Sequence, residues 1–192
     1  MLFRSRSACS VGGENRYHVI FGGGPSYAVH PSNAAVALVA LGASFVFDGP
    51  KGPRTVAASE FFQLPSKNEL VENSLAPAEI LTEIRVPAAA GRSIYDEVRE
   101  RQAFDWPLVS LAASVRVEGG LVKDCRVVLG AVAPVPWRSN RAEAALMGKP
   151  LNETTLQDVA RAAIVGAAPM SDNGYKVSLV QTLVRRTLAQ LA

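Results

Sequence analysis

The sequence is poor in the residues from which metal centres and nucleophilic active sites are usually built. Its 192 residues include two cysteines, Cys9 and Cys125, and two histidines, His18 and His30. Two cysteines cannot form a disulfide framework, and no Cys-x-x-Cys or His-x-x-x-His spacing offers a self-contained metal site. The serines near the histidines lie in no Gly-x-Ser-x-Gly elbow. We therefore predict no metal site and no catalytic residue on this chain.

Charge of one sign and long apolar runs are also lacking. The 20 lysines and arginines nearly balance the 17 aspartates and glutamates, for a net charge of +3, so we expect no nucleic-acid partner. The longest apolar stretches, such as residues 34–47, are interrupted by glycine and serine and are too short to span a membrane. The N-terminus MLFRSRSACSVGG has no continuous apolar segment typical of a secretory signal. We predict no membrane association.

The composition that remains is that of a globular protein. At 48% hydrophobic residues, the chain can build one large domain or two small ones. The segment AAAGRS, residues 88–93, is the best linker because its small side chains carry little packing information. The pattern differs on its two sides, which predicts an α+β fold in two pieces.

Before the linker, the pattern predicts a helix, a hairpin and a further strand. The helix covers residues 33–41, with Ser32 as its cap and Gly42 as its stop. Two strands surround the turn DGPKGP, whose prolines and glycines enforce a reversal. A short helix or turn, SEFFQLP, and a strand, LTEIRVP, complete this piece.

After the linker, the pattern predicts a three-stranded antiparallel sheet covered by helices. The strands are SIYDEVRER, LVSLAASVRV and LVKDCRVVLGAVAP, the last two joined by a Glu-Gly-Gly hairpin; buried in a strand, Cys125 acts as a small hydrophobe. The helices are SNRAEAALMG, ETTLQDVARAAIVGAA and a final one from about Gly174. The final helix has one apolar face, made of Leu179, Val180, Leu183, Val184, Leu188 and Leu191.

The stretch FGGGPSYAVHPSN raises the question of phosphate binding. It matches neither Gly-x-Gly-x-x-Gly nor a P-loop, and residues 25–30 separate its glycines from the helix start. The glycines are therefore expected to form a flexible turn. Pro31, Ser32 and Asn33 begin the helix, where free N–H groups can receive an anion, although capping alone also explains them.

Several segments together resemble a known family. They include GENRYHVIFGGG, YAVHPSNAAVALVALGA, GPKGPRTVAASEFFQLP, YDEVRERQAFDWPLVSLAASV and NGYKVSLVQTLVRRTLAQL. In this order, from residue 13 to the C-terminus, they are similar to the FAD-binding subunit of the molybdenum hydroxylases, which include xanthine dehydrogenase, carbon monoxide dehydrogenase and aldehyde oxidoreductase. The periplasmic aldehyde oxidoreductase type is the most similar.

The resemblance implies a domain division and a function. Residues 1–88 would be the C-terminal part of the FAD-binding domain, and residues 89–192 a domain like the C-terminal domain of the CO dehydrogenase flavoprotein. FAD on this chain would pass electrons to an acceptor. They would come from the iron–sulfur clusters of a small subunit, and originally from the molybdenum cofactor of a large subunit. The chain would be cytoplasmic, or periplasmic if it is exported with a partner subunit.

The resemblance also implies flavin contacts at Asn33, Leu81 and Glu97. Asn33 replaces an aspartate of the family, and Glu97 stands where many members have lysine. The loop over residues 102–106 resembles the segment beside the isoalloxazine ring. Its Phe104 and Trp106 either limit access to the ring or are core aromatics.

Some family features have no counterpart in the sequence. Members carry a Val-Ala-Gly-Gly loop around the FAD pyrophosphate and a second motif ending in Gly-Gly-Asn, and the most similar type adds a four-cysteine iron–sulfur insertion. Cys9 stands where the last of these cysteines is expected, and one thiolate cannot hold a cluster. The sequence thus suggests a gene fragment that binds FAD weakly by itself. Two alternatives are a module that only docks onto partner subunits and a degenerate fragment without a biochemical role.

Overall fold

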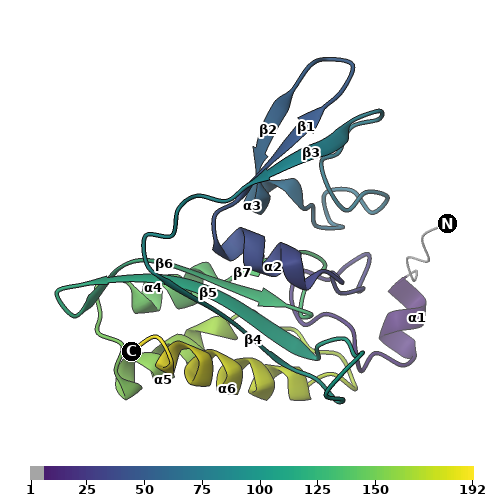
Figure 1. The fold of residues 1–192 in the computed structure, drawn as a ribbon. Helices are drawn as coiled ribbons and strands as arrows, with labels where there is room; N and C mark the ends of the chain where they lie inside the picture. Colours follow the sequence, from purple (N-terminus) through teal and green to yellow (C-terminus); the bar gives the residue numbers. More distant parts are fainter. Residues whose placement is uncertain (1–6) are drawn as a thin grey trace.

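A computed structural model describes residues 7–192 and, from residue 10 onward, their side chains. Figure 1 shows two antiparallel sheets, with helix α2 between them and a layer of helices beneath the larger sheet. The predicted α+β class is confirmed. No helix within residues 7–192 is long and apolar enough to cross a membrane.

The smaller sheet follows the sequence pattern closely. The predicted hairpin forms around the Gly/Pro turn, and the third strand pairs with the first of the hairpin, giving the order β2-β1-β3. The predicted helix is present, and the Ser32 hydroxyl caps it by accepting a hydrogen bond from the Ala35 N–H at 3.1 Å. The elements of this half are α1 (Ser7–Gly12), α2 (Asn33–Ala40), β1 (Ser44–Asp48), β2 (Arg54–Ala57), α3 (Ala58–Phe61) and β3 (Ile80–Arg85).

The larger sheet has the order β4-β5-β6-β7 and four strands, so the prediction of three was wrong. The extra strand is only two residues long, too short to leave a periodic pattern. The linker is also shorter than expected, because Arg92 and Ser93 already belong to a strand. The elements of this half are β4 (Arg92–Val98), β5 (Val109–Glu118), β6 (Leu121–Gly130), β7 (Trp137–Arg138), α4 (Asn140–Leu146), α5 (Glu153–Ala163) and α6 (Tyr175–Ala189).

The larger sheet is buried on both faces, and one of these faces packs against the N-terminal half of the chain. Along β5, Leu111 and Ala113 face the core between the sheet and helices α4, α5 and α6, whereas Ala112 faces a second core. This second core also contains Val36 of α2 and Phe45 of β1. Because side chains alternate along a strand, one strand supplies both cores. The N-terminal half therefore packs on the sheet of the C-terminal half.

The segment before α2 belongs to the C-terminal core. Ile20 and Phe21 are buried there, and the Phe21 ring stacks on Trp137 with centroids 5.1 Å apart. The Ala168 N–H donates to the Ile20 carbonyl at 2.8 Å. Helix α5 ends at Ala163, earlier than the pattern predicts, and Gly166, with a φ of +90°, forms the turn that follows.

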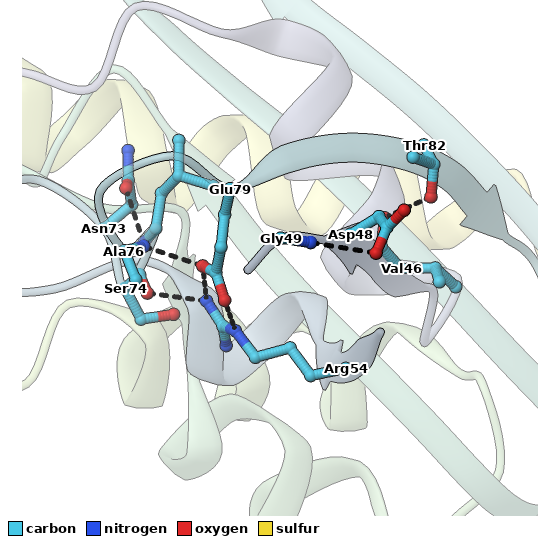
Figure 2. A network of polar contacts seen from close by, with 10 residues as sticks. Val46, Asp48, Gly49, Arg54, Asn73, Ser74, Ala76, Glu79 and Thr82 are labelled. Carbon is cyan, nitrogen blue, oxygen red and sulfur yellow. Dashed lines mark hydrogen bonds and ion pairs between the residues drawn. The ribbon is translucent and has the colours of Figure 1, made fainter. Parts of the chain in front are cut away.

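One ion pair connects β2 to the loop before β3, as Figure 2 shows. Arg54 donates to both carboxylate oxygens of Glu79, at 2.6 and 2.7 Å, and to the Ser74 carbonyl at 2.7 Å. Glu79 also accepts the Ala76 N–H at 2.7 Å. The Arg54 hydrogen bonds, with this N–H, lower the pKa of Glu79 to about 2.

The pH dependence of stability is expected to report this ion pair. Because the folded pKa of Glu79 lies below its ordinary value of 4.5, its stabilisation is present above pH 4.5 and is lost as the pH falls toward 2. Urea unfolding of wild type and Glu79→Gln should differ at pH 6 and converge at acid pH. A difference that stays constant from pH 6 to pH 2 would contradict this linkage.

Limited proteolysis is expected to cut the linker first. Residues 86–91 are all exposed, and Figure 1 shows them crossing between the two sheets. Helix α6, by contrast, buries Val180, Leu183 and Leu188. Mass spectrometry of early fragments should locate the first cut within residues 86–91. A first cut within residues 175–190 would contradict the two-piece organisation.

Candidate functional site

A cavity of about 480 Å³ opens where the N-terminal segment, the loop after β4 and the start of α6 meet. This volume lies in the range of small-molecule and cofactor sites. Apolar side chains make up most of its wall, and a few polar groups converge on it. Its lining includes Tyr17, His30, Asn33, Glu100, Trp106 and Lys176.

The start of α2 supplies Asn33, whose amide is held by Glu97 of β4. The Asn33 Nδ2 donates to Glu97 Oε2 at 3.1 Å, and the Tyr95 hydroxyl donates to the same oxygen at 2.8 Å. Arg99 forms an ion pair with the other carboxylate oxygen. Burial, together with the Glu97 carboxylate, raises the pKa of Tyr95. Asn33 and Glu97, both predicted as flavin contacts, are thus brought together although they lie 64 positions apart. Glu97 orients Asn33, which lines the cavity.

The loop after β4 forms one wall of the cavity. Asp105 stabilises it by accepting the backbone N–H groups of Arg101 and Trp106, at 2.9 and 3.0 Å. Trp106 lines the cavity and is 68% exposed, and Phe104 is fully exposed. The interpretation of these two rings as core aromatics was therefore wrong. An exposed indole beside a cavity offers a stacking surface for a planar ligand.

Lys176 lies in the cavity wall at the start of α6, with only 1% of its surface exposed. Its ammonium donates to the carbonyl oxygens of Tyr17, at 2.9 Å, and Ala131, at 2.7 Å. Burial lowers its pKa to about 8. At neutral pH the side chain is mostly charged.

His30, which also lines the cavity, carries a ring nitrogen without a hydrogen-bond partner. Its Nε2 is buried without a hydrogen-bond partner, and burial lowers the pKa of the ring. The ring meets Phe62 edge-on, with centroids 4.7 Å apart. A buried orphan nitrogen next to a cavity is a group that a ligand can satisfy.

Comparison with known proteins establishes the family. The family model for the CO dehydrogenase flavoprotein C-terminal domain matches residues 93–191, and that for the FAD binding domain in molybdopterin dehydrogenase matches residues 6–89. The chain belongs to the FAD-binding flavoprotein family of the molybdenum hydroxylases.

Individual relatives of this flavoprotein support the same family. The aldehyde oxidoreductase FAD-binding subunit of Escherichia coli (strain K12) is 31% identical over 96% of this chain and 56% of its own length. The carbon monoxide dehydrogenase medium chain of Hydrogenophaga pseudoflava is 36% identical over 83% of this chain and 56% of its own. A solved chain of that dehydrogenase superposes with a TM-score of 0.74 at 32% identity, over 84% of this chain and 56% of that one. The chain thus spans about half the length of the relatives it matches.

The three glycines of this flavoprotein form a turn that neighbouring side chains fill. A Cβ at Gly22, whose φ is +60°, would lie 2.9 Å from Leu64 Cδ2, and one at Gly23 would lie 2.6 Å from the Tyr27 ring. Glycine is required here because side chains approach the backbone. The turn is therefore not an open phosphate cradle.

Leu81, another residue singled out by the sequence, is not part of the cavity lining. Leu81 lies on β3, where it pairs with Phe47 of β1 and is 44% exposed. Its role as a flavin contact stays a prediction. Cys9 lies in α1, but its side chain falls outside the part that the structure describes. In that described part, no cluster of His, Cys, Asp or Glu could hold a metal ion.

Sequence reasoning missed Lys176, although the pattern of the final helix contained a signal. Lys176 precedes Val180 by one helical turn, so it lies on the apolar face of α6 rather than on its polar face. A lysine within an apolar stripe is unusual because burying a charge is costly.

Proposed function

We propose that this chain contributes the isoalloxazine side of the FAD site in a molybdenum hydroxylase. The observation that carries the proposal is the cavity bounded by Asn33, Trp106 and the orphan nitrogen of His30. A planar heteroaromatic ring fits this combination, because it can stack on the indole and accept or donate at its polar edge.

The donor set fits the ring better than it fits the pyrophosphate. Dinucleotide sites hold the pyrophosphate with glycine-rich turns and free N–H groups at a helix start. Here the glycine turn is filled, and Ser32 occupies the Ala35 N–H of α2. When bound, FAD supplies the redox chemistry itself. The role of Asn33, Glu97 and Trp106 is then to orient and shield the ring, and none acts as acid, base or nucleophile.

The partners and the location follow from this role. Electrons would come from an iron–sulfur small subunit, which receives them from a molybdenum-containing large subunit during oxidation of an aldehyde, purine or similar substrate. Relatives of this chain carry the names of medium chains or FAD-binding subunits of such dehydrogenases. We place the chain in the cytoplasm, or in the periplasm after export with a partner.

A second function, docking onto partner subunits without a flavin, is favoured by the exposed strand β3. Ile80, Leu81 and Ile84 are 70%, 44% and 48% exposed on this edge strand. Exposed apolar edges readily pair with other chains. A colourless chain that co-purifies with large and small subunits would support this function, and a flavin spectrum would support the first.

Flavin-ring binding is expected to depend on Trp106. FMN, which has the ring but no adenine half, should bind Trp106→Ala about tenfold more weakly than wild type, because losing the stacking partner costs about 1.4 kcal/mol. Quenching of flavin fluorescence measures this. Phe104→Ala is the matched control, because Phe104 is an exposed ring of the same loop outside the cavity lining. Equal losses in the two variants would contradict the proposed ring site.

A further inference from the structure

The charge of Lys176 lacks an anionic partner among residues 7–192. Its ammonium contacts two carbonyl oxygens, and it takes part in none of the ion pairs formed by the described residues. An ammonium has three N–H donors, so these two contacts leave one donor, on a side chain that lines the cavity. A buried charge is costly unless something compensates it.

The carboxylates of the cavity are committed elsewhere. Glu100 pairs with Arg16 at 2.5 Å and accepts the Tyr17 hydroxyl at 3.1 Å. Asp105 accepts two backbone N–H groups of its own loop. His18 lies close enough to Lys176 for the ammonium to help burial in lowering its pKa. Neither carboxylate of the cavity lining therefore pairs with Lys176.

We propose that Lys176 makes the cavity bind a reduced, anionic flavin ring more tightly than an oxidised, neutral one. The inference rests on the proposed function. Uptake of two electrons and one proton by a neutral flavin ring leaves one negative charge on the ring. That charge would then lie in the cavity whose wall holds the unpaired ammonium. Lys176 thereby favours electron transfer onto the flavin and is a residue that tunes its reduction potential.

The midpoint potential of FMN bound to this chain tests the proposal. The FMN phosphate carries the same charge in both redox states, so its contribution cancels. Tenfold tighter binding of the reduced form corresponds to a rise of about 30 mV over free FMN for this two-electron couple. Reductive titration with dithionite, followed by absorbance, should show this rise in potential in wild type and in Lys176→Arg. The rise should be lost in Lys176→Met.

A pH series on the wild type gives a second readout that needs no variant. Raising the pH from 7 to 9.5 takes Lys176 through its lowered pKa of about 8 and removes its charge. The rise in midpoint potential of bound FMN over free FMN, both measured at the same pH, should then disappear. Of the surrounding groups, His18 and His30 have pKa values lowered by burial, so neither imidazole gains a charge as the pH rises from 7.

The outcomes separate this proposal from the one it rests on. FMN that binds wild type with no rise in potential, or with the same rise in Lys176→Met, would overturn the role of Lys176 and leave the flavin site intact. Failure of wild type to bind FMN at millimolar concentration would overturn both. If Lys176→Met does not fold, as judged by circular dichroism, the wild-type pH series and Lys176→Arg still decide.

Discussion

Titration of FAD into the isolated chain is expected to show weak binding, with a dissociation constant well above the submicromolar range. Most of the affinity of dinucleotide sites comes from backbone N–H groups around the pyrophosphate. Residues 7–192 offer a filled glycine turn and a helix start at which Ser32 caps the Ala35 N–H. A loss of about 4 kcal/mol weakens binding about a thousandfold. Flavin fluorescence during the titration measures the dissociation constant directly.

Comparison of FAD with FMN makes this expectation sharper. If the chain contacts only the ring, the two flavins should bind with dissociation constants within a few-fold of each other. The Trp106→Ala variant should weaken both equally. Submicromolar FAD binding at one site per chain, or FAD binding a hundredfold tighter than FMN, would show that residues 1–192 hold the pyrophosphate as well.

Replacement of Asn173 by alanine is expected to give a large loss of stability. Asn173 is fully buried, and its Nδ2 donates to the carbonyl oxygens of His18 and Val19 at 3.2 and 3.1 Å. Its Oδ1 accepts the Met170 N–H at 2.7 Å. Leaving such groups without partners costs about 2–4 kcal/mol in total. Urea unfolding followed by circular dichroism should show this decrease in the free energy of unfolding.

The same variant should also damage the cavity. The segment that Asn173 holds includes Tyr17, whose carbonyl binds Lys176. FMN binding should therefore weaken in Asn173→Ala even below its unfolding temperature. Asn140→Ala is the matched control, because Asn140 is exposed at the start of α4, and it should change neither property. A change in stability below 0.5 kcal/mol for Asn173→Ala would contradict the role of these hydrogen bonds.

Local signals in the sequence were sufficient for most elements of the fold. The Ser32 cap, the Gly/Pro turn between β1 and β2 and the apolar stripe of α6 all lie where the pattern predicts them. Each of these signals involves residues a few positions apart. They express backbone preferences and side-chain periodicity, which need no knowledge of the remaining chain. The order of several such segments was also enough to indicate the family.

Features that depend on distant residues were decided only by the tertiary structure. Strand β7 exists because Trp137 and Arg138 pair with β6. Similarly, the Ala168 N–H after α5 donates to the carbonyl of Ile20, which is far away in the sequence. The contact of Asn33 with Glu97 and the place of Lys176 in the cavity join segments 64 and 159 positions apart. Whether a buried charge has a partner depends on what the whole fold brings around it, and no local pattern contains that information.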